Sequence, residues 1–395
     1  MLVIDRWERG ELERRGWLLV YGRRKVGKTF MLKRIRHDLY ITITRSGRAI
    51  ISEEIVDVDD AVKEALRELK GGGIVVVDEF QRMEEHYWDL LSQPHPNGRL
   101  ILSGSSLRVV SKVLGSRSPL LGLLEPFKVE IIAFHDVLLS LKPKDRDGLL
   151  WSVLLRDPWI IPMVDLKSKP EDFIGQRAEG LYMSARGLVG EVFSDEEREL
   201  TKLYEAVLLL LGEGVWNLKE MAGILTSRGM IEGVSSITAV LDRLVNMGLV
   251  KKVRAWRSRG RYFYRHSSPL LSVLFYLESK YGVSDGYRPK SQAVSSVLGR
   301  ELEQSVGELL AAWHGGELAY HRSPEGDLDV VVLRGKKVLA AYEVKASQPS
   351  ESEVKRKLAY AEKMGLNLRF VGPGGDLDLE DLLRISSSLR HSRIS

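Results

Sequence analysis

The chain carries the stretch Gly22-Arg23-Arg24-Lys25-Val26-Gly27-Lys28-Thr29 directly after an apolar run at residues 17–21. This stretch fits the pattern G-x-x-x-x-G-K-[ST] at the end of a predicted strand. In such a loop the glycines let backbone amides wrap around phosphate oxygens, Lys28 neutralises their charge and Thr29 ligates Mg²⁺. A Gly-rich surface turn is the alternative. The preceding strand favours a phosphate-binding loop, so we expect all eight residues to bind a nucleotide.

A second motif lies about fifty residues further on, where the apolar run at residues 74–77 ends in Asp78 and Glu79. An acid at this strand end can bind the nucleotide's Mg²⁺ together with Thr29, and an adjacent acid can polarise the attacking water. In the alternative interpretation, both acids only cap the next helix. The pair predicts ATP as the nucleotide, Mg²⁺ as the metal and Glu79 as the catalytic residue.

Five apolar runs alternate with polar helical stretches in the first third of the chain, at residues 17–22, 39–43, 74–78, 99–105 and 127–134. Continuous apolar strands are typical of a parallel sheet that is buried on both faces. We therefore expect an α/β P-loop NTPase fold with an extra strand between the two motifs. Ser103 or Ser105, at the end of that strand, can contact the γ-phosphate or cap a helix.

Composition restricts the classes of protein that remain. The 395 residues favour two or three domains, and 59 Lys and Arg against 54 Asp and Glu give a formal net charge of +5. Residues 1–40 hold eleven of the basic and five of the acidic residues, which points to local polyanion sites. The absence of cysteine excludes disulfides and thiolate metal sites. Without a long apolar run or an apolar N-terminus, we expect a cytoplasmic protein that does not contact membranes.

The pattern changes three times along the chain. We predict a P-loop ATPase core at residues 1–135, a helical lid or connector at 136–194, a winged helix at 195–285 and a small α/β domain at 286–395. The third segment is expected from three amphipathic helical patterns that precede two β-rich runs.

The two β-rich runs form a predicted basic hairpin. Seven of the residues from 251 to 265 are Lys or Arg and none is acidic, and aromatic residues lie among them. Cations and aromatics on a β-ribbon suit phosphate contact and stacking on nucleic acid. The alternative is a solvated hairpin whose aromatics pack on the helices. The predicted nucleic-acid contacts are Lys251, Lys252, Arg254, Arg257, Arg259 and Arg261.

A carboxylate cluster is predicted in the last segment. Asp329 opens one strand, and Glu343 and Lys345 end the next. Strand side chains alternate with period two, so Glu343 and Lys345 share a face. Asp329 and Glu343 can then hold Mg²⁺ while Lys345 orients the attacking water. A hairpin with a cross-strand ion pair is the alternative.

The segments GRRKVGKT, VVVDEFQ and LILSGSSL, followed by SPLLG, resemble the archaeal ATPase family of AAA+/STAND-related P-loop proteins. The resemblance implies a winged helix after the ATPase core and a C-terminal domain similar to PD-(D/E)XK nucleases. By the nuclease pattern, Glu303 is preferred over Glu301 as the upstream metal ligand. The family commonly places an arginine after the glycine of its P-L-x-G segment, whereas Leu123 follows Gly122 here and Arg117 lies nearby.

Together these features predict an Mg²⁺-dependent ATPase that acts on DNA, with Asp329, Glu343 and Lys345 as candidate nuclease residues and a possible homo-oligomeric state. One alternative is a slow regulatory ATP switch, which the missing arginine favours. Another is a C-terminal domain that recognises nucleic acid without cutting it.

Overall fold

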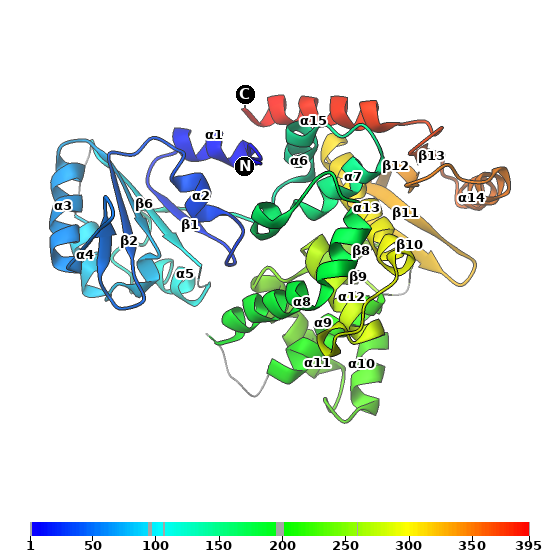
Figure 1. Ribbon diagram of the computed structural model, residues 1–395, viewed down its shortest axis with the longest axis horizontal. Coiled ribbons are helices and arrows are strands. Elements are labelled where there is room, and N and C mark those ends of the chain that lie inside the picture. Colours follow the sequence, from blue (N-terminus) through cyan, green and yellow to red (C-terminus); the bar gives the residue numbers. More distant parts are fainter. Residues whose placement is uncertain (1, 94–96, 106, 195–200, 259, 395) are drawn as a thin grey trace. The chain divides into compact units, whose positions relative to one another are not determined.

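Residues 2–93, 97–105, 107–194, 201–258 and 260–394 are described by the computed structural model (Figure 1). They fall into two units. The N-terminal unit is Arg6–Ile131, and the C-terminal unit is Ile132–Ser395 together with Met1–Asp5.

The N-terminal unit is an α/β fold built on one sheet. Its strands are β1 (Leu18–Tyr21), β2 (Leu39–Ile43), β3 (Ala49–Ile51), β4 (Glu54–Val56), β5 (Ile74–Asp78), β6 (Arg99–Gly104) and β7 (Glu125–Lys128). Its helices are α1 (Trp7–Arg14), α2 (Lys28–Leu32), α3 (Val58–Lys70), the short 3₁₀ turn η1 (Phe80–Arg82), α4 (His86–Leu91) and α5 (Leu107–Val113).

The seven strands have the order β4-β3-β2-β5-β6-β1-β7, and β2, β5, β6, β1 and β7 run parallel. Strand β6 therefore lies between the two motif strands β1 and β5, which confirms the predicted extra strand. Successive residues of the central strands are buried on opposite faces. Leu18 and Val20 pack with Leu12 of α1 and Met31 of α2, whereas Leu19 joins a cluster that includes residues of α3 and α4.

Two details of this sheet differ from the sequence prediction. The apolar run at residues 127–134 is not one strand, because β7 ends at Lys128 and Phe134 already begins helix α6. The hairpin of β3 and β4 was not predicted. Each of its strands has three residues, and the turn residues Ser52 and Glu53 have positive φ angles of 48° and 74°, so the segment lacks a long apolar pattern.

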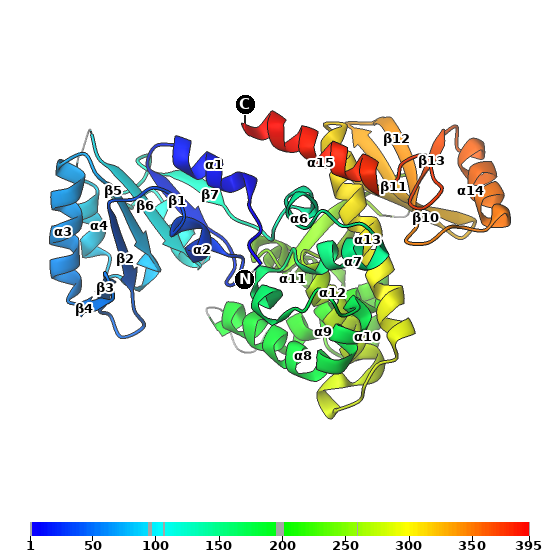
Figure 2. The same ribbon diagram turned by 45° about the horizontal axis from the view of Figure 1, so that its top comes forward.

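The C-terminal unit contains a second sheet surrounded by helices (Figure 2). Its strands are β8 (Val250–Ala255), β9 (Tyr262–His266), β10 (Glu317–Ser323), β11 (Gly326–Arg334), β12 (Lys337–Val344) and β13 (Leu368–Val371). Its helices are α6 (Phe134–Leu141), α7 (Arg146–Leu154), η2 (Pro158–Met163), α8 (Pro170–Ser194), α9 (Thr201–Glu213), α10 (Leu218–Ser227), α11 (Val234–Asn246), α12 (Pro269–Tyr281), η4 (Val283–Asp285), α13 (Ser291–Trp313), α14 (Glu351–Lys363) and α15 (Leu379–Ile394).

This second sheet has the order β13-β12-β11-β10-β8-β9. Helix α13 packs on one face, where a Cβ at Gly307 would approach Val330 within 3.0 Å. The neighbouring residue Val331 points to the other face and shares a buried cluster with Ala361 of α14. The sheet thus has α13 on one side and α14 on the other, which places residues from both helices near its strand ends.

The three helices α9, α10 and α11 and the hairpin of β8 and β9 follow in the predicted order. The hairpin is not a separate ribbon, however, because β8 also pairs with β10 in parallel, with Ala319 opposite Arg254 and Tyr320 opposite Ala255. One continuous sheet therefore crosses residue 285, where we expected a boundary between two segments.

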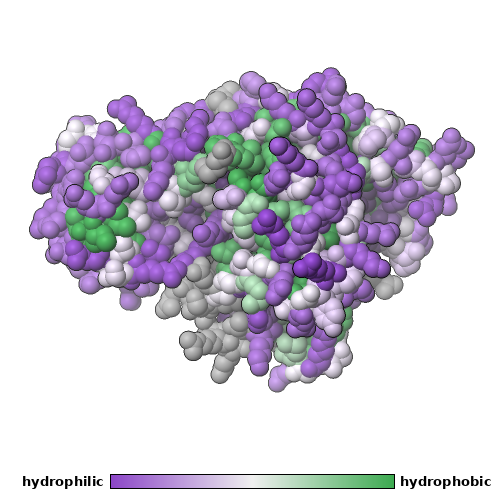
Figure 3. Space-filling view, in the orientation of Figure 1, coloured by the Kyte–Doolittle hydropathy of each residue, from purple (hydrophilic) through white to green (hydrophobic). Residues whose placement is uncertain are grey.

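Hydrophilic residues prevail on the face of the molecule that Figure 3 shows, and hydrophobic residues form smaller patches between them. Among the described residues, the exposed large hydrophobic side chains include Phe30, Ile55 and Tyr287. No helix in the described part of the chain is both long and apolar enough to cross a membrane.

Candidate functional sites

The loop from Gly22 to Thr29 joins β1 to α2 and depends on unusual backbone angles. Gly22 has a φ of 155° and lies so close to the Val129 carbonyl that a Cβ would collide with it. Gly27 has a φ of 94°, and Lys25 adopts a positive φ of 63°. These angles turn the chain sharply between strand and helix, as a loop that wraps around phosphate requires.

Lys28 is folded into this loop and is 6% exposed. Its Nζ donates hydrogen bonds to the carbonyl oxygens of Gly22, at 2.7 Å, and Arg23, at 3.1 Å. Burial lowers the pKa of Lys28 to about 8, although Glu79 and Asp78 act in the opposite direction. A buried ammonium with only carbonyl partners is suited to receive an anionic ligand.

Thr29 and Asp78 meet at the carboxyl ends of the parallel strands. The Thr29 hydroxyl donates to Asp78 Oδ2 at 2.6 Å, and the Tyr40 hydroxyl donates to the same oxygen at 3.0 Å. Sequence reasoning missed Tyr40, although its place near the end of β2 was the available signal. Hydroxyl and carboxylate oxygens are the ligands that Mg²⁺ prefers, so the donor set fits this ion.

Glu79 follows Asp78 in a left-handed backbone conformation, with a φ of 58°. Its carboxylate accepts a hydrogen bond from Gln81 Nε2 at 2.7 Å and forms an ion pair with Arg82 at 3.0 Å. Gln81 also donates to the Ser105 hydroxyl at 3.2 Å. Glu79 is therefore held next to the loop by two neighbours from the turn that follows it.

Ser103 lies opposite Asp78 in the register of β5 and β6 and is fully buried. Its hydroxyl has no hydrogen-bond partner among the described residues. Arg6 supports the loop from Gly22 to Thr29 from outside. Val26 of this loop is fully buried, and its carbonyl accepts a hydrogen bond of 2.7 Å from Arg6, which also contacts the Glu130 carbonyl. Arg6 was not found from the sequence. Arg23 is buried and Arg24 half-buried in the same loop.

The segment that differs from the family pattern is exposed. Leu123, which stands where the family commonly has an arginine, is 44% exposed. Arg117, the nearby arginine, is exposed as well.

The four acidic and basic residues predicted for the last segment line one cavity of about 230 Å³ in the C-terminal unit. Glu303 comes from α13, Asp329 from β11 and Glu343 from β12, and Lys345 follows β12. We call this the carboxylate cavity. Glu301, which the sequence could not separate from Glu303, instead accepts hydrogen bonds from Arg265 and Ser272 elsewhere.

Lysines neutralise the deepest acid of this cavity. Glu343 is fully buried, and its Oε1 lies 3.0 Å from Lys345 Nζ and 2.9 Å from Lys357 Nζ. Glu353 holds Lys345 from the other side at 2.8 Å. Glu353 and Glu343 keep the pKa of Lys345 above its usual value, although burial alone would lower it.

Two further acids of the carboxylate cavity, Asp329 and Glu303, are less acidic than usual. Burial raises the pKa of Asp329 well above its ordinary value, and the charges of Glu303 and Glu343 add to this effect. Burial raises the pKa of Glu303 to about 7, against the influence of Arg265 and Lys345. In the part of the chain that the structure describes, no three His, Asp or Glu side chains are grouped as a metal site.

Most of the predicted nucleic-acid contacts on the hairpin have partners within the protein. Lys252 contacts Asp242 at 2.7 Å, and Arg254 contacts Glu317 at 3.3 Å. Arg257 donates to the Met364 carbonyl at 3.0 Å, and Arg261 lies over the Tyr262 ring. Arg259 lies outside the described residues. Among the described cations of the hairpin turn, Arg257 and Arg261 are exposed.

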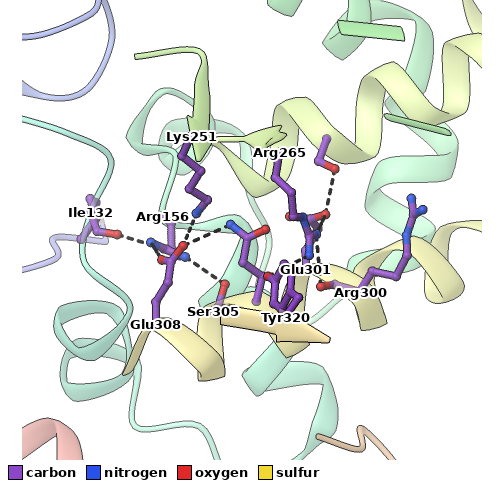
Figure 4. A network of polar contacts seen from close by, with 11 residues as sticks. Ile132, Arg156, Lys251, Arg265, Arg300, Glu301, Ser305, Glu308 and Tyr320 are labelled. Atoms are coloured by element: carbon purple, nitrogen blue, oxygen red, sulfur yellow. Dashed lines mark hydrogen bonds and ion pairs between the residues drawn. The ribbon is translucent and has the colours of Figure 1, made fainter. Parts of the chain in front are cut away.

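Lys251 is part of a buried network rather than of the surface (Figure 4). It pairs with Glu308 of α13, which also binds Arg156 at 2.7 Å. Arg156 in turn donates to Ser305 at 2.9 Å and to the Ile132 carbonyl at 3.2 Å. Burial alone would raise the pKa of Glu308, but its two cationic partners hold it well below the usual range. No sequence pattern pointed to this network.

Comparisons with known proteins agree with the N-terminal geometry. Residues 14–137 match the family model of an AAA domain. A solved structure of a Walker-type ATPase from Pyrococcus abyssi is similar to this chain with a TM-score of 0.50 and 18% identity, over 69% of this chain and 96% of that chain.

Two more distant structures come from Aeropyrum pernix. The ORC1 protein in complex with DNA has a TM-score of 0.28 and 16% identity over 75% of this chain and 89% of that chain. The ORC2 protein has a TM-score of 0.35 and 13% identity over 74% and 89%. A search of curated proteins found no match.

The N-terminal fold and its site thus define a P-loop domain of the AAA type. The match of residues 14–137 to the AAA domain supports an ATPase.

Proposed function

We propose that this ATPase depends on Mg²⁺ and acts on DNA, and that its C-terminal unit combines a winged helix with a PD-(D/E)XK nuclease-like domain. The observation that carries the ATP part is the bond of 2.6 Å between the Thr29 hydroxyl and the Asp78 carboxylate, directly beside Glu79. It joins both sequence motifs at one edge of the sheet, where nucleotides bind in open α/β folds.

Each residue of the loop has a distinct task in this proposal. The amides of residues 22–27 and the Lys28 ammonium bind the phosphates, with Lys28 exchanging its two carbonyl partners for phosphate oxygens. Thr29 and Asp78 would hold Mg²⁺, which neutralises phosphate charge when bound. Glu79 accepts the proton of the attacking water, and the buried Ser103 hydroxyl is a candidate donor to the terminal phosphate.

The nuclease-like part of the proposal is supported by the carboxylate cavity, which Glu303, Asp329, Glu343 and Lys345 line together. In this proposal a divalent ion would draw on Glu303, Asp329 and Glu343, although these acids are not grouped as a metal site in the described structure, and Lys345 would orient water toward a phosphodiester. Asp329 is already fixed by the backbone amide of Val344, which donates to its Oδ2 at 3.0 Å.

Contact with DNA is proposed through the winged helix of α9, α10, α11 and the hairpin. The exposed Arg257 and Arg261 at the turn of the hairpin, together with Lys252 beside them, remain suitable for phosphate. Lys251 is excluded from this role by its pair with Glu308. The hairpin therefore offers fewer contacts than its composition suggests.

A slow regulatory switch is a second candidate for the ATPase. Glu79 is bound by Gln81 and Arg82, and the position after Gly122 holds Leu123. Both features favour slow turnover until a partner frees Glu79 or supplies an arginine. For the C-terminal unit, the two lysines on Glu343 favour a recognition domain that does not cut.

The test is ATP turnover with Mg²⁺, in the absence and presence of single-stranded, duplex and branched DNA, with cleavage followed in the same reactions. DNA-stimulated turnover with cleavage that Asp329→Ala and Glu343→Ala both abolish supports the full proposal. Turnover that no DNA changes supports the switch, and binding without cleavage supports the recognition domain.

A further inference from the structure

Five cations line the carboxylate cavity, and they differ in whether an acid neutralises them. Arg265 pairs with Glu301 at 2.7 Å, and Lys345 and Lys357 both pair with Glu343. Arg322 and Arg356 have no ion pair among the described residues, and both are exposed. These two arginines are thus the cations of the cavity that remain available to a ligand.

The guanidinium of Arg322 is held in place without an acid. It lies 3.9 Å from the centre of the Trp216 ring. Trp216 is itself buried and fixed, since its Nε1 donates to the Leu211 carbonyl at 3.1 Å. The backbone amide of Arg322 donates to the Ser258 hydroxyl at 2.8 Å, so the turn of the hairpin fixes the end of β10. The side chain is therefore oriented before any ligand arrives.

Arg356 reaches the cavity from helix α14, on the other side of the acids. Four residues further along the helix, the Tyr360 hydroxyl lies 2.7 Å from His321 Nε2. The Tyr360 ring packs on Gly326, where an added Cβ would lie 2.9 Å from it. These contacts tie α14 to the turn between β10 and β11, and so fix the position of Arg356 relative to Arg322.

A planar guanidinium with several donors matches a phosphate group better than an ammonium does, and stacking on an aromatic ring reduces the entropy lost on binding. Two such groups beside a cluster of acids suit a ligand with repeated phosphates. We propose that Arg322 and Arg356 bind the backbone phosphates of a nucleic-acid strand that crosses the carboxylate cavity. The inference rests on the proposed action on DNA and names the strand-binding residues of that site.

This assignment differs from the sequence prediction, which placed the nucleic-acid contacts on the hairpin. Because phosphate contacts carry no sequence information, the binding we infer is independent of base sequence. Each arginine that neutralises a phosphate releases counterions, so it adds roughly 0.7 to 0.9 to the slope of log K against log salt concentration.

The test is fluorescence anisotropy of labelled single-stranded and duplex oligonucleotides over a range of salt concentrations, with EDTA to prevent cleavage. We expect Arg322→Gln and Arg356→Gln each to weaken binding and to reduce the salt slope by about one, and the double variant by about two. Arg322→Lys keeps the charge and should retain most of the slope. The matched control is Lys336→Gln, which removes an exposed cation from the turn between β11 and β12.

If both glutamine variants bound DNA with the affinity and salt slope of the wild-type chain, the inference would be overturned. The proposed action on DNA would stand in that case, because the wild-type chain would still bind DNA. If the wild-type chain bound no oligonucleotide, the proposed action on DNA would fall, and this inference with it. Should Arg322→Gln disturb the fold, as its melting temperature would reveal, Arg356→Gln decides alone, because the exposed Arg356 side chain forms no hydrogen bond or ion pair with the described residues.

Discussion

The phosphate-binding loop and the carboxylate cavity are built on different principles. In the N-terminal unit, Thr29 and Asp78 touch directly, and the loop residues are consecutive in sequence. In the C-terminal unit, Glu303 and Glu343 come from a helix and a strand 40 residues apart, and Lys345 and Lys357 occupy the central acid. The first site presents its ligand-binding groups to phosphate, whereas the second has neutralised most of its charge internally.

The difference shows that counting charged residues in a segment does not locate a binding surface. The hairpin has seven basic residues between 251 and 265. Of these, Lys251 pairs with the half-buried Glu308 and Arg265 with the buried Glu301. The loop from Gly22 to Thr29 is equally basic, yet Lys28 meets only carbonyl oxygens there. Which acids lie nearby in space decides whether a cation stabilises the fold or binds a ligand.

The largest effect is expected from breaking the buried network. Glu308→Ala would leave Lys251 and Arg156 without their acid, which should lower the free energy of unfolding by about 3–5 kcal/mol. Glu317→Ala is the control, because its pair with Arg254 is exposed and should contribute less than about 1 kcal/mol. Urea unfolding followed by circular dichroism measures both. Equal losses in the two variants would show that Lys251 is not a structural residue.

A smaller effect is expected at the loop itself. Lys28→Ala removes the charge that binds phosphate and should raise the Kd for ATP about 30-fold or more, the equivalent of about 2 kcal/mol. Isothermal titration calorimetry measures the change. Lys63→Ala, on the exposed face of α3, removes the same charge and should leave the Kd unchanged. An unaltered Kd in Lys28→Ala would remove the lysine from the site.

The pH dependence of ATP binding sharpens the comparison further. Because burial lowers the pKa of free Lys28 to about 8, and bound phosphate favours the ammonium, binding above pH 8 takes up a proton. The affinity should be nearly constant well below pH 8 and fall about fivefold from pH 8 to pH 9, because Lys28 is about half protonated at pH 8 and about one-eleventh protonated at pH 9. Lys28→Arg stays charged and should lose this dependence. Calorimetry in two buffers of different ionisation enthalpy detects the proton, and equal apparent enthalpies at pH 9 would refute its uptake.

The sequence predicted the parts of the molecule that depend on local patterns. The motif strands, the strand between them and the helices α9 to α11 and α13 follow from periodicity over a few residues. The pairing of β8 with β10 was not predictable, because Arg254 and Ala319 are 65 residues apart and no local pattern encodes the register between them.

The same limit applies to the sites. Lys28, Thr29 and Asp78 could be predicted because strand order brings two short motifs together. Glu308 could not be identified as the partner of Lys251, since acids on a helix look alike in sequence. The availability of Arg322 depends on Trp216, about a hundred residues earlier, and on its lack of an ion pair among the described residues.

In our account, ATP is hydrolysed at the carboxyl ends of the strands of the N-terminal sheet, with Glu79 as the general base. The most direct test is the steady-state ATP turnover of Glu79→Gln beside its Kd for ATP, with Glu64→Gln on α3 as the control. We predict that the kcat of Glu79→Gln is lower than that of the wild type by a factor of about 100 or more. Its Kd for ATP should stay close to that of the wild type, because only the acceptor of the water proton is lost. A Glu79→Gln variant that turns over ATP at the wild-type rate would contradict the account.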